Sequence, residues 1–223
     1  MSDYRVLDLF CGLGGFSQAF AASDRWSVTT VDIEARFEPD RVADVFELHP
    51  SDFNQQFDVV LASPPCQYLS TAGNHDRWDH MEKSPADDTA ADAVALFFHA
   101  LGVIKGLDPT YWYVENPRAS RIQWFYRRPD EWVTYCQYGK SYQKPTGLWG
   151  EFAPMTFERC RSGASCHTSN GADDGTSAVQ SMPSDTGVRS KVPAELSAAI
   201  RDACEAALDG DVAEQTTLGE VHA

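Results

Sequence analysis

The chain has 223 residues, of which 43% are hydrophobic and 12% aromatic, and its formal net charge at pH 7 is -15. This length and composition predict one domain with an ample core. Polar residues follow the first methionine and no apolar run approaches the ~20 residues that cross a bilayer, so we expect a cytoplasmic protein with no membrane partner. The six cysteines suggest no disulfide framework, which favours a reducing compartment.

The acidic charge is the feature that most restricts the choice of partner. A protein that binds nucleic acid is expected to carry a basic surface. Here 21 of the 33 acidic residues are aspartate, and only five of the 18 cationic residues are lysine. In molar salt the Debye length is about 3 Å, and such a surface hardly repels phosphate at a distance. The composition therefore argues against binding nucleic acid in dilute buffer and suggests a high-salt host.

The first element is an apolar run over residues 5–10, which predicts a strand. It passes into a turn with Gly12, Gly14 and Gly15, followed by a helical pattern. Glycines let the backbone approach a ligand closely at the carboxyl end of a strand, where doubly wound sheets bind cofactors. The pattern therefore predicts a cofactor loop, although a tight strand-to-helix connection would have the same pattern.

A second strand is predicted near residues 27–32 and ends in Asp32, about 20 residues after the glycines. Folds of this kind place there the acid that binds the ribose hydroxyls of the cofactor. The glycines form Gly-x-Gly-Gly and not the full dinucleotide pattern, so nothing requires a pyrophosphate. We therefore expect a cofactor with a single nucleoside.

Two further strands, near residues 58–62 and 111–115, end in reactive side chains. Cys66 follows a Pro-Pro pair directly after the first of these strands, and Glu115 ends the second. Prolines fix the direction of the thiol, as a nucleophile requires, whereas most free cysteines are small buried hydrophobes. If the strands are parallel, Cys66 and Glu115 lie at the same edge of the sheet.

Helical periodicity is clearest over residues 89–107, and a second helix is predicted over 193–208. Alternating strands and helices indicate a doubly wound, mostly parallel α/β sheet. We divide the chain into a catalytic domain at 1–150, a short irregular insert at 151–188, a returning helix at 189–208 and an acidic tail at 209–223. The insert is rich in Ser, Gly, Asp and Thr and is too small for a separate domain.

Three segments in this order resemble the cytosine-C5 DNA methyltransferase family. Residues 8–17 (DLFCGLGGFS) are similar to its S-adenosylmethionine (AdoMet) motif, 64–73 (PPCQYLSTAG) to its Pro-Cys loop, and 115–116 to its Glu-Asn motif. Residues 188–196 resemble its last motif. Residues 136–139 (CQYG) and 144–149 (KPTGLW) are similar to compact, virus-encoded members. The resemblance implies a Rossmann-like, AdoMet-dependent methyltransferase of class I that acts on double-stranded DNA.

The resemblance implies a chemistry in which Cys66 adds to C6 of a flipped cytosine, Glu115 holds the N3 edge, and the activated C5 takes the methyl group. Asn116 and Lys144 would complete the catalytic group, with Lys144 the one clear cation where the family has an arginine-rich segment. The implied cofactor residues are Asp8, Phe10, Gly12, Gly14, Gly15, Asp32, Ile33, Asp44 and Pro64. Asp44 could equally be an ordinary loop acid.

The DNA-contacting candidates are Gln67, Ser70, Arg77, Arg118 and Arg121. The two last of these, with Arg127 and Arg128, are interleaved with the aromatic residues 124–126. This suits phosphate pairing and base stacking, but a solvated turn packed on an aromatic core fits the pattern equally well. The short insert at 151–188 stands where the family has its recognition region, so we expect a recognition site of a few bases or a specificity partner. We expect the chain itself to be a monomer.

The insert carries Cys160, Cys166 and His167, which could hold zinc if Cys136 folded over them. Adjacent Cys-His is not a common zinc-finger spacing, and a loop with unpaired thiols is the alternative. Two other functions remain open at this point. One is a pyrimidine-C5 methyltransferase acting on tRNA or a free nucleotide, which the acidic charge would tolerate better. The other is a non-catalytic AdoMet-binding partner subunit.

Overall fold

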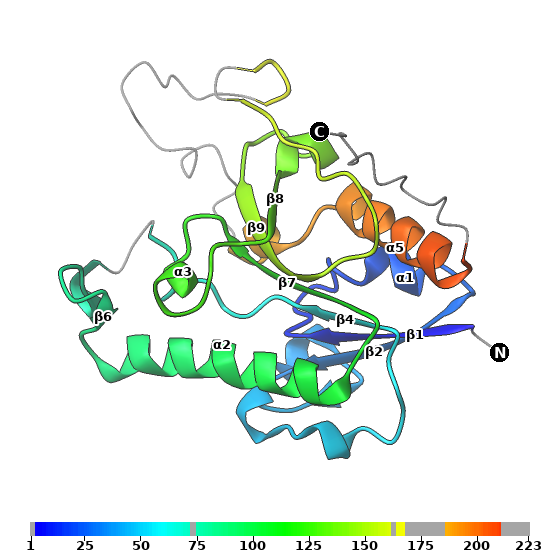
Figure 1. Cartoon of the computed structure of the whole chain (residues 1–223), viewed down its shortest axis with the longest axis horizontal. Coiled ribbons are helices and arrows are strands. Elements are labelled where there is room, and N and C mark those ends of the chain that lie inside the picture. Colours follow the sequence, from blue (N-terminus) through cyan, green and yellow to red (C-terminus); the bar gives the residue numbers. More distant parts are fainter. Residues whose placement is uncertain (1–2, 72–74, 162–163, 168–185, 211–223) are drawn as a thin grey trace, which may run out of the picture.

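The computed structural model describes residues 3–71, 75–161, 164–167 and 186–210 (Figure 1). Seven strands form the main sheet: β1 (Tyr4–Leu9), β2 (Trp26–Asp32), β3 (Arg41–Val42), β4 (Val59–Ala62), β7 (Tyr111–Pro117), β8 (Glu131–Thr134) and β9 (Pro145–Glu151). The α-helices are α1 (Gln18–Ala21), α2 (Asp88–Leu107), α3 (Ile122–Phe125), α4 (Thr186–Ser190) and α5 (Ala194–Leu208). A small hairpin pairs β5 (Trp78–Asp79) with β6 (Ser84–Pro85). Short 3-10 helices are η1 (Ala35–Phe37), η2 (Val45–Glu47), η3 (Pro50–Asp52), η4 (His75–Arg77) and η5 (Tyr135–Tyr138).

The strands lie in the order β3-β2-β1-β4-β7-β9-β8, and only β9 runs antiparallel to its neighbours. The predicted doubly wound, mostly parallel sheet is therefore confirmed, as are the four strands and two helices expected from periodicity. The chain order reverses between β1 and β4, and ligands bind at such a switch point, outside the carboxyl ends of the strands. Both β1 and β4 lead into candidate site segments there.

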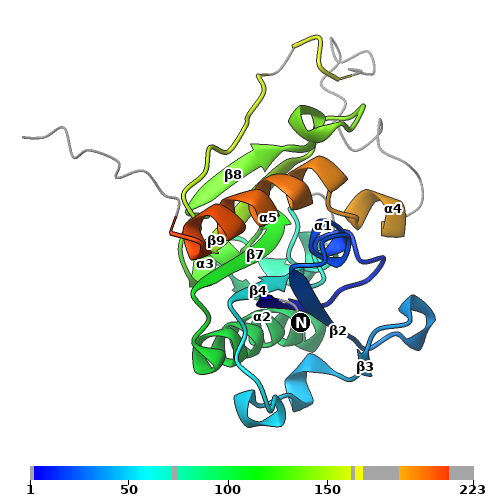
Figure 2. The same ribbon diagram turned by 90° about the vertical axis from the view of Figure 1, so that its right-hand side faces the viewer.

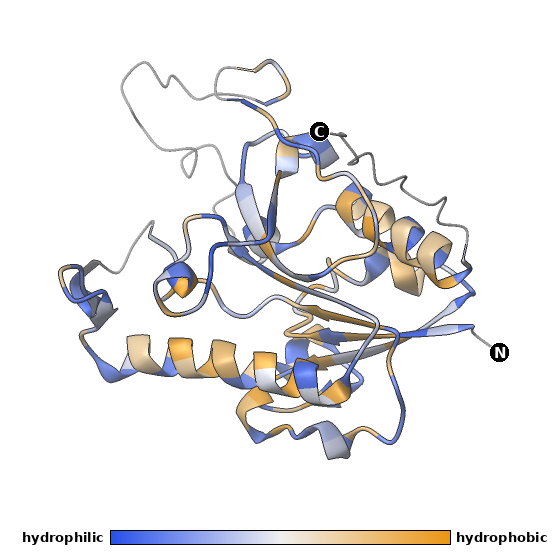
Figure 3. Ribbon diagram, viewed as in Figure 1, coloured by the Kyte–Doolittle hydropathy of each residue, from blue (hydrophilic) through white to orange (hydrophobic). Residues whose placement is uncertain are grey.

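Helices cover both faces of the sheet (Figure 2). On one face, Phe97, Ala100 and Ile104 of α2 are buried in a cluster with alternate side chains of the central strands. On the other face, α1 and α5 close a second cluster, into which α5 contributes Leu196 and Ile200. Figure 3 shows the apolar residues along both long helices. A sheet buried on both faces explains the apolar run of β4 and the burial of residues 6–9 in β1.

The helix α2 corrects one expectation from the sequence. It is 20 residues long with a hydropathy of 1.5, so by length and composition it could cross a membrane. The expectation that no apolar run approaches that length was therefore wrong. Core helices of soluble proteins pass the same test, and five residues of α2 are buried. These five side chains belong to the core cluster on one face of the sheet.

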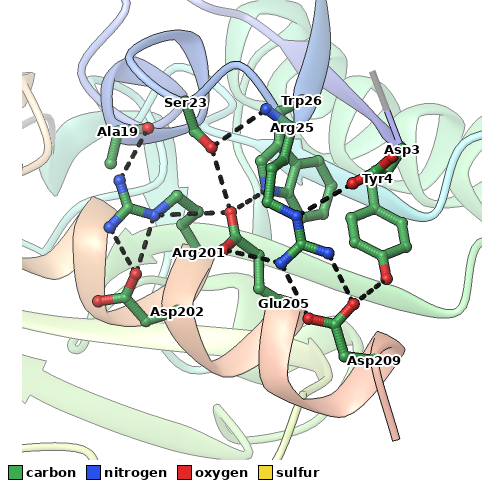
Figure 4. Close-up of polar contacts among 10 residues, drawn as sticks. All are labelled: Asp3, Tyr4, Ala19, Ser23, Arg25, Trp26, Arg201, Asp202, Glu205 and Asp209. Carbon is green, nitrogen blue, oxygen red and sulfur yellow. Dashed lines mark hydrogen bonds and ion pairs between the residues drawn. The ribbon is translucent and has the colours of Figure 1, made fainter. Parts of the chain in front are cut away.

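Charged side chains connect α5 to the amino-terminal ends of β1 and β2 (Figure 4). The Arg25 guanidinium pairs with Asp209 at 2.6 Å and with Asp3 at 3.1 Å. Glu205 of α5 accepts a hydrogen bond from the Trp26 indole N–H at 2.6 Å. The Arg25 hydrogen bond lowers the pKa of Asp209 to about 2. These contacts place α5 beside β1 and β2.

The first residues of the predicted insert pack on the sheet. The Phe152 ring stacks on Tyr113 with centroids 5.0 Å apart, and the Ala153 N–H donates to the Tyr113 hydroxyl at 3.0 Å. Residues 162–163 and 168–185 of the insert, and 211–223 of the predicted tail, lie outside the described residues. The division of the chain at 150 and 188 therefore stays a prediction.

Candidate active site

The glycine-rich loop leaves the carboxyl end of β1 in a conformation that few residues adopt. Phe10, Gly12 and Gly14 all have positive φ, at 62°, 50° and 66°. A Cβ at Gly12 or Gly14 would meet nothing within 4 Å, so at both glycines the space beside the loop is open. Asp32 at the end of β2 fixes the loop by accepting the Gly12 N–H at 2.8 Å. The arrangement leaves an open backbone surface at the switch point, as a cofactor loop requires.

Asp32 accepts two backbone hydrogen bonds, the second from Glu34 N–H at 2.9 Å. Each carboxylate oxygen keeps a further lone pair for a ligand hydroxyl. Asp44 stands after β3, where its side chain caps η2 by accepting the Phe46 N–H at 3.0 Å. Both predicted acids therefore lie at the ends of neighbouring strands and also stabilise local turns.

Two of the predicted cofactor residues are buried supports of the loop. Asp8 is fully buried in β1, where its carboxylate accepts the Ser17 hydroxyl at 2.6 Å and burial raises its pKa to about 7. A Cβ on Gly15 would lie 2.7 Å from the backbone N of Val192, so glycine there permits close packing of the chain before α5. Asp8 and Gly15 therefore hold the shape of the loop, and the cofactor contact implied for them stays a prediction.

Exposed apolar side chains line the same edge of the sheet and were missed by sequence reasoning, except for Ile33. Leu13, Ile33 and Phe46 follow β1, β2 and β3 respectively, and they are 49%, 62% and 41% exposed. A pocket of about 240 Å³ opens between Phe46, the Pro-Cys loop and α2, with Pro65 and Leu96 in its wall. Apolar surface at this place suits a purine ring. No local pattern in the sequence marks these side chains as exposed.

The Pro-Cys loop follows β4 and is held by Asn116 of β7. The Asn116 amide donates to the Pro64 carbonyl oxygen at 3.0 Å and is fully buried. The Cys66 carbonyl in turn accepts the Ser70 N–H at 2.8 Å, which closes a turn after the thiol. Burial, and after it the charge of Glu115, raise the pKa of the Cys66 thiol, while Lys144 acts in the opposite direction. The structure thus brings Cys66, Glu115 and Lys144 into one electrostatic environment.

Glu115 is 5% exposed and receives two donors on the same oxygen. The Tyr135 hydroxyl donates to Oε1 at 2.9 Å, and the Lys144 ammonium lies 3.4 Å from Oε1. Lys144 also donates to the Arg189 carbonyl at 3.3 Å and lies 4.6 Å from the centre of the Tyr135 ring. Within the described residues both contacts end on Oε1, which leaves Oε2 for a ligand.

Tyr135 is a site residue that the sequence did not reveal. It is fully buried in η5, and burial together with Glu115 raises its pKa well above the usual range. Its hydroxyl therefore stays protonated and acts as a donor. The only sequence signal was its place directly before the segment 136–139 that resembles compact family members; that a tyrosine there faces Glu115 depends on the antiparallel return of β9.

The DNA-contacting candidates divide into exposed and buried residues. Gln67 is exposed, Ser70 is half-buried, and Arg118 is exposed with its guanidinium 3.9 Å from the centre of the Trp132 ring. Arg77 forms an ion pair with Asp87, the N-cap of α2. Arg121 is fully buried, donates to the Ser70 carbonyl and lies 5.1 Å from the Trp78 ring centre. Arg121 thus holds the Pro-Cys loop from inside the protein, and the DNA contact implied for it stays a prediction.

The four metal candidates come together. The sulfurs of Cys136, Cys160 and Cys166 and a ring nitrogen of His167 all lie within 4.8 Å of one another. Cys136 belongs to η5 and the other three to the insert.

A glycine-rich loop at the switch point of a doubly wound sheet, with Pro-Cys and Glu-Asn at the next strand ends, defines a Rossmann-like methyltransferase that uses AdoMet. Residues 4–120 match the model of the family described as C-5 cytosine-specific DNA methylase. The chain belongs to this family, and its class of activity is that of a DNA (cytosine-5-)-methyltransferase.

Curated relatives agree with this assignment. The chain is 34% identical over 168 residues to "Probable DNA (cytosine-5)-methyltransferase" of Frog virus 3 (isolate Goorha), a match over 73% of this chain and 77% of that protein. The predicted similarity to compact viral members is thereby confirmed. It is 29% identical over 124 residues to "Type II methyltransferase M.HaeII" of Haemophilus aegyptius, covering 52% of this chain and 35% of that protein. Identity to "Type II methyltransferase M.DdeI" of Desulfomicrobium norvegicum is 27% over 124 residues, covering 50% of this chain and 27% of that protein.

Proposed function

We propose that this chain methylates C5 of cytosine in double-stranded DNA through a covalent bond between Cys66 and C6 of a base flipped out of the helix. One observation carries the proposal: Cys66 and the buried Glu115–Lys144 ion pair lie together, with Cys66 and Glu115 at the ends of neighbouring strands. Flipping is required because C6 is inaccessible to a thiol inside the base stack. The family assignment makes AdoMet the methyl donor.

The residues divide the chemistry between them. The Cys66 sulfur forms a bond to C6 while a proton reaches N3, with Glu115 holding the N3 and amino edge through Oε2. Tyr135 and Lys144 hold Oε1 and so fix the rotation of the carboxylate. AdoMet supplies an electrophilic methyl group, which the electron-rich C5 accepts. Loss of the C5 proton to a base, elimination of the Cys66 thiolate from C6 and return of the N3 proton then release 5-methylcytosine.

Cofactor binding is assigned to the open side of the loop. The backbone at Gly12 and Gly14 would face the methionine part, and Asp32 the ribose hydroxyls, beside Phe10. The exposed Ile33 and the pocket at Phe46 suit the adenine ring. The open space at both glycines supports this fit, because a side chain there would fill it.

Recognition is proposed from the short insert at 151–188 and from the side chains near the Pro-Cys loop. Gln67, Ser70, Arg77 and Arg118 lie on or near the catalytic loop and are the side chains that we assign to DNA. We propose a monomer with a recognition site of a few bases, or one that depends on a partner protein, and we place it in the cytoplasm with its substrate.

The test is transfer of a labelled methyl group from AdoMet to duplex DNA in molar KCl, with mass spectrometry of the digested nucleosides. We expect 5-methylcytosine from the native chain and none from Cys66→Ala, with equal AdoMet binding by both in calorimetry. AdoMet binding without any methylated DNA would contradict the proposal. Methylation of tRNA or a free nucleotide in its place, or of no substrate, would then favour a different pyrimidine methyltransferase or a non-catalytic subunit.

A further inference from the structure

Four soft donors converge on the side of η5 that faces the insert. Cys136 lies in η5, directly after Tyr135, and is 8% exposed. The Cys136 and Cys160 sulfurs are 3.1 Å apart, and those of Cys136 and Cys166 are 3.7 Å apart. The Nδ1 atom of His167 lies 3.7 Å from the Cys160 sulfur and 3.5 Å from the Cys166 sulfur. Two segments distant in the chain thus supply three thiols and one imidazole to a single point.

Three of the four separations match the edges of a zinc tetrahedron. Zinc binds sulfur at about 2.3 Å and histidine nitrogen at about 2.0 Å, so ligand atoms around one ion are separated by about 3.3–3.8 Å. The Cys136–Cys166 sulfur separation and both sulfur–nitrogen separations lie in that range, whereas the Cys136 and Cys160 sulfurs are closer, at 3.1 Å. All four atoms fall within 4.8 Å of one another.

The surroundings of the sulfurs are those of metal-bound thiolates. The Gln143 amide donates to the Cys160 sulfur at 2.9 Å, and the Gln137 amide donates to the Cys166 sulfur at 3.1 Å. The Cys160 N–H donates to the Thr134 hydroxyl at 2.7 Å, which fixes the backbone of that ligand. Hydrogen bonds from outside the ligand set orient the ligands and stabilise the charge of thiolates.

We propose that Cys136, Cys160, Cys166 and His167 bind one structural zinc ion. Four protein ligands fill the coordination shell and leave no open position, so the ion has no catalytic place. Its role is to fasten the start of the insert to η5. Since Tyr135 begins η5 and donates to Glu115, the zinc also supports the position of the catalytic carboxylate. The ion-binding claim does not depend on the proposed function.

A disulfide between Cys136 and Cys160 is the competing arrangement. It would use only two of the four donors and would not explain why Cys166 and His167 lie at the same point. It would also require an oxidising environment, whereas a zinc site of thiolates forms in a reducing one.

The test measures metal in the full chain, purified under reducing conditions without chelator. We expect about one zinc per chain by elemental mass spectrometry. Replacement by Co²⁺ should give the strong visible absorption of tetrahedral thiolate coordination. Cys136→Ser and Cys160→Ser should lose the metal and His167→Ala should weaken its binding, whereas Ser165→Ala, in the same loop, should keep it. Cys204→Ala should keep it as well, because that buried thiol lies outside the cluster.

The apo protein provides the decisive titration. After removal of metal and reduction, it should rebind Zn²⁺ with a dissociation constant well below about 1 µM, as structural sites do. Reduced protein that binds neither Zn²⁺ nor Co²⁺ at that concentration would overturn the proposal. So would metal binding that survives both Cys136→Ser and Cys160→Ser in chains that circular dichroism shows to be folded. Isolation of the chain with a Cys136–Cys160 disulfide under reducing conditions would also overturn it.

Discussion

Two donors, the Tyr135 hydroxyl and the Lys144 ammonium, contact the same oxygen of Glu115. Their distances predict how much each contributes to holding the carboxylate in place. A hydrogen bond to a charged group contributes about 1.5–3 kcal/mol, and loss of that amount in the transition state slows a reaction about 10- to 100-fold. The Tyr135 hydroxyl, at 2.9 Å, is the closer donor. The Lys144 ammonium is farther away and shares its protons with the Arg189 carbonyl.

We therefore predict that Tyr135→Phe lowers kcat for methyl transfer by about 10- to 100-fold and leaves the affinity for AdoMet unchanged. Steady-state kinetics and calorimetry measure the two quantities. Tyr142→Phe is the matched control, because the Tyr142 hydroxyl is buried without a partner in the described part of the chain. An equal loss in both variants would show that the Tyr135 hydroxyl has no specific role.

The charges of Glu115 and Lys144 influence how the reactivity of the Cys66 thiol depends on pH. Its pKa is raised by burial and by Glu115 and lowered by Lys144. Only the thiolate reacts with an alkylating reagent, so the rate at a given pH below the pKa follows the thiolate fraction. The native rate should rise with pH throughout the range in which the thiol is mainly protonated.

The two charged neighbours should act with opposite sign. Glu115→Gln lowers the pKa of Cys66 and should speed its alkylation at pH 8, whereas Lys144→Gln raises the pKa and should slow it, each on the order of tenfold. Peptide mass spectrometry follows the reaction, with the fully buried Cys204 as internal control. Changes of the same sign in both variants would mean that Cys66 does not share an environment with this pair.

At the scale of elements, the parallel half of the sheet was predictable and the antiparallel half was not. The strands β1, β4 and β7 are buried on both faces and have long apolar stretches, so their ends, and with them Cys66 and Glu115, could be placed from sequence. The strand β9 contains Gly147 and Gly150, where a Cβ would meet Pro129 and the Trp112 carbonyl oxygen. Glycine is typical of turns, so this strand was missed, and the contact of Tyr135 with Glu115 was missed with it. The burial of Arg121 near two indole rings was not predictable for a related reason: its sequence pattern is the same as that of an exposed basic turn.

The connection between the cofactor loop and α5 yields a prediction at this scale. Gly15→Ala places a methyl group 2.7 Å from the backbone N of Val192, which cannot retreat like a side chain. We expect a loss of about 1–3 kcal/mol in the free energy of unfolding, measured by urea denaturation. Gly102→Ala, in the interior of α2 with nothing within 4 Å of the new Cβ, should instead stabilise the protein by up to about 1 kcal/mol. If both substitutions changed the free energy of unfolding in the same direction, the close contact of Gly15 with the chain before α5 would be contradicted.

For the whole molecule, the net charge of -15 must influence both stability and DNA binding. Like charges repel one another in the folded state, and raising the salt from about 0.1 M to about 1 M shortens the Debye length from about 10 Å to about 3 Å. Several arginines are already paired with acids, among them Arg25 and Arg77, and so are not free to offset the charge elsewhere.

We predict that the Tm of the native chain rises between about 0.1 M and about 1 M KCl, because screening removes more repulsion than it weakens ion pairs. Calorimetric scans at constant pH measure this change. Arg25→Gln serves as a control for the paired edge, since it should lower Tm at low salt and show a steeper rise with KCl. A fall in Tm with KCl would mean that the ion pairs outweigh the net repulsion.

The central claim is that Cys66 forms a bond with the cytosine that is methylated. The most direct measurement uses duplex DNA containing 5-fluorocytosine together with AdoMet. Because fluorine at C5 cannot leave as a proton does, the sulfur–C6 bond cannot be eliminated after methyl transfer and the adduct persists. We predict that peptide mass spectrometry finds the nucleotide on Cys66 and finds none with Cys66→Ala. An adduct on another cysteine, or no adduct from protein that methylates ordinary DNA, would contradict the account.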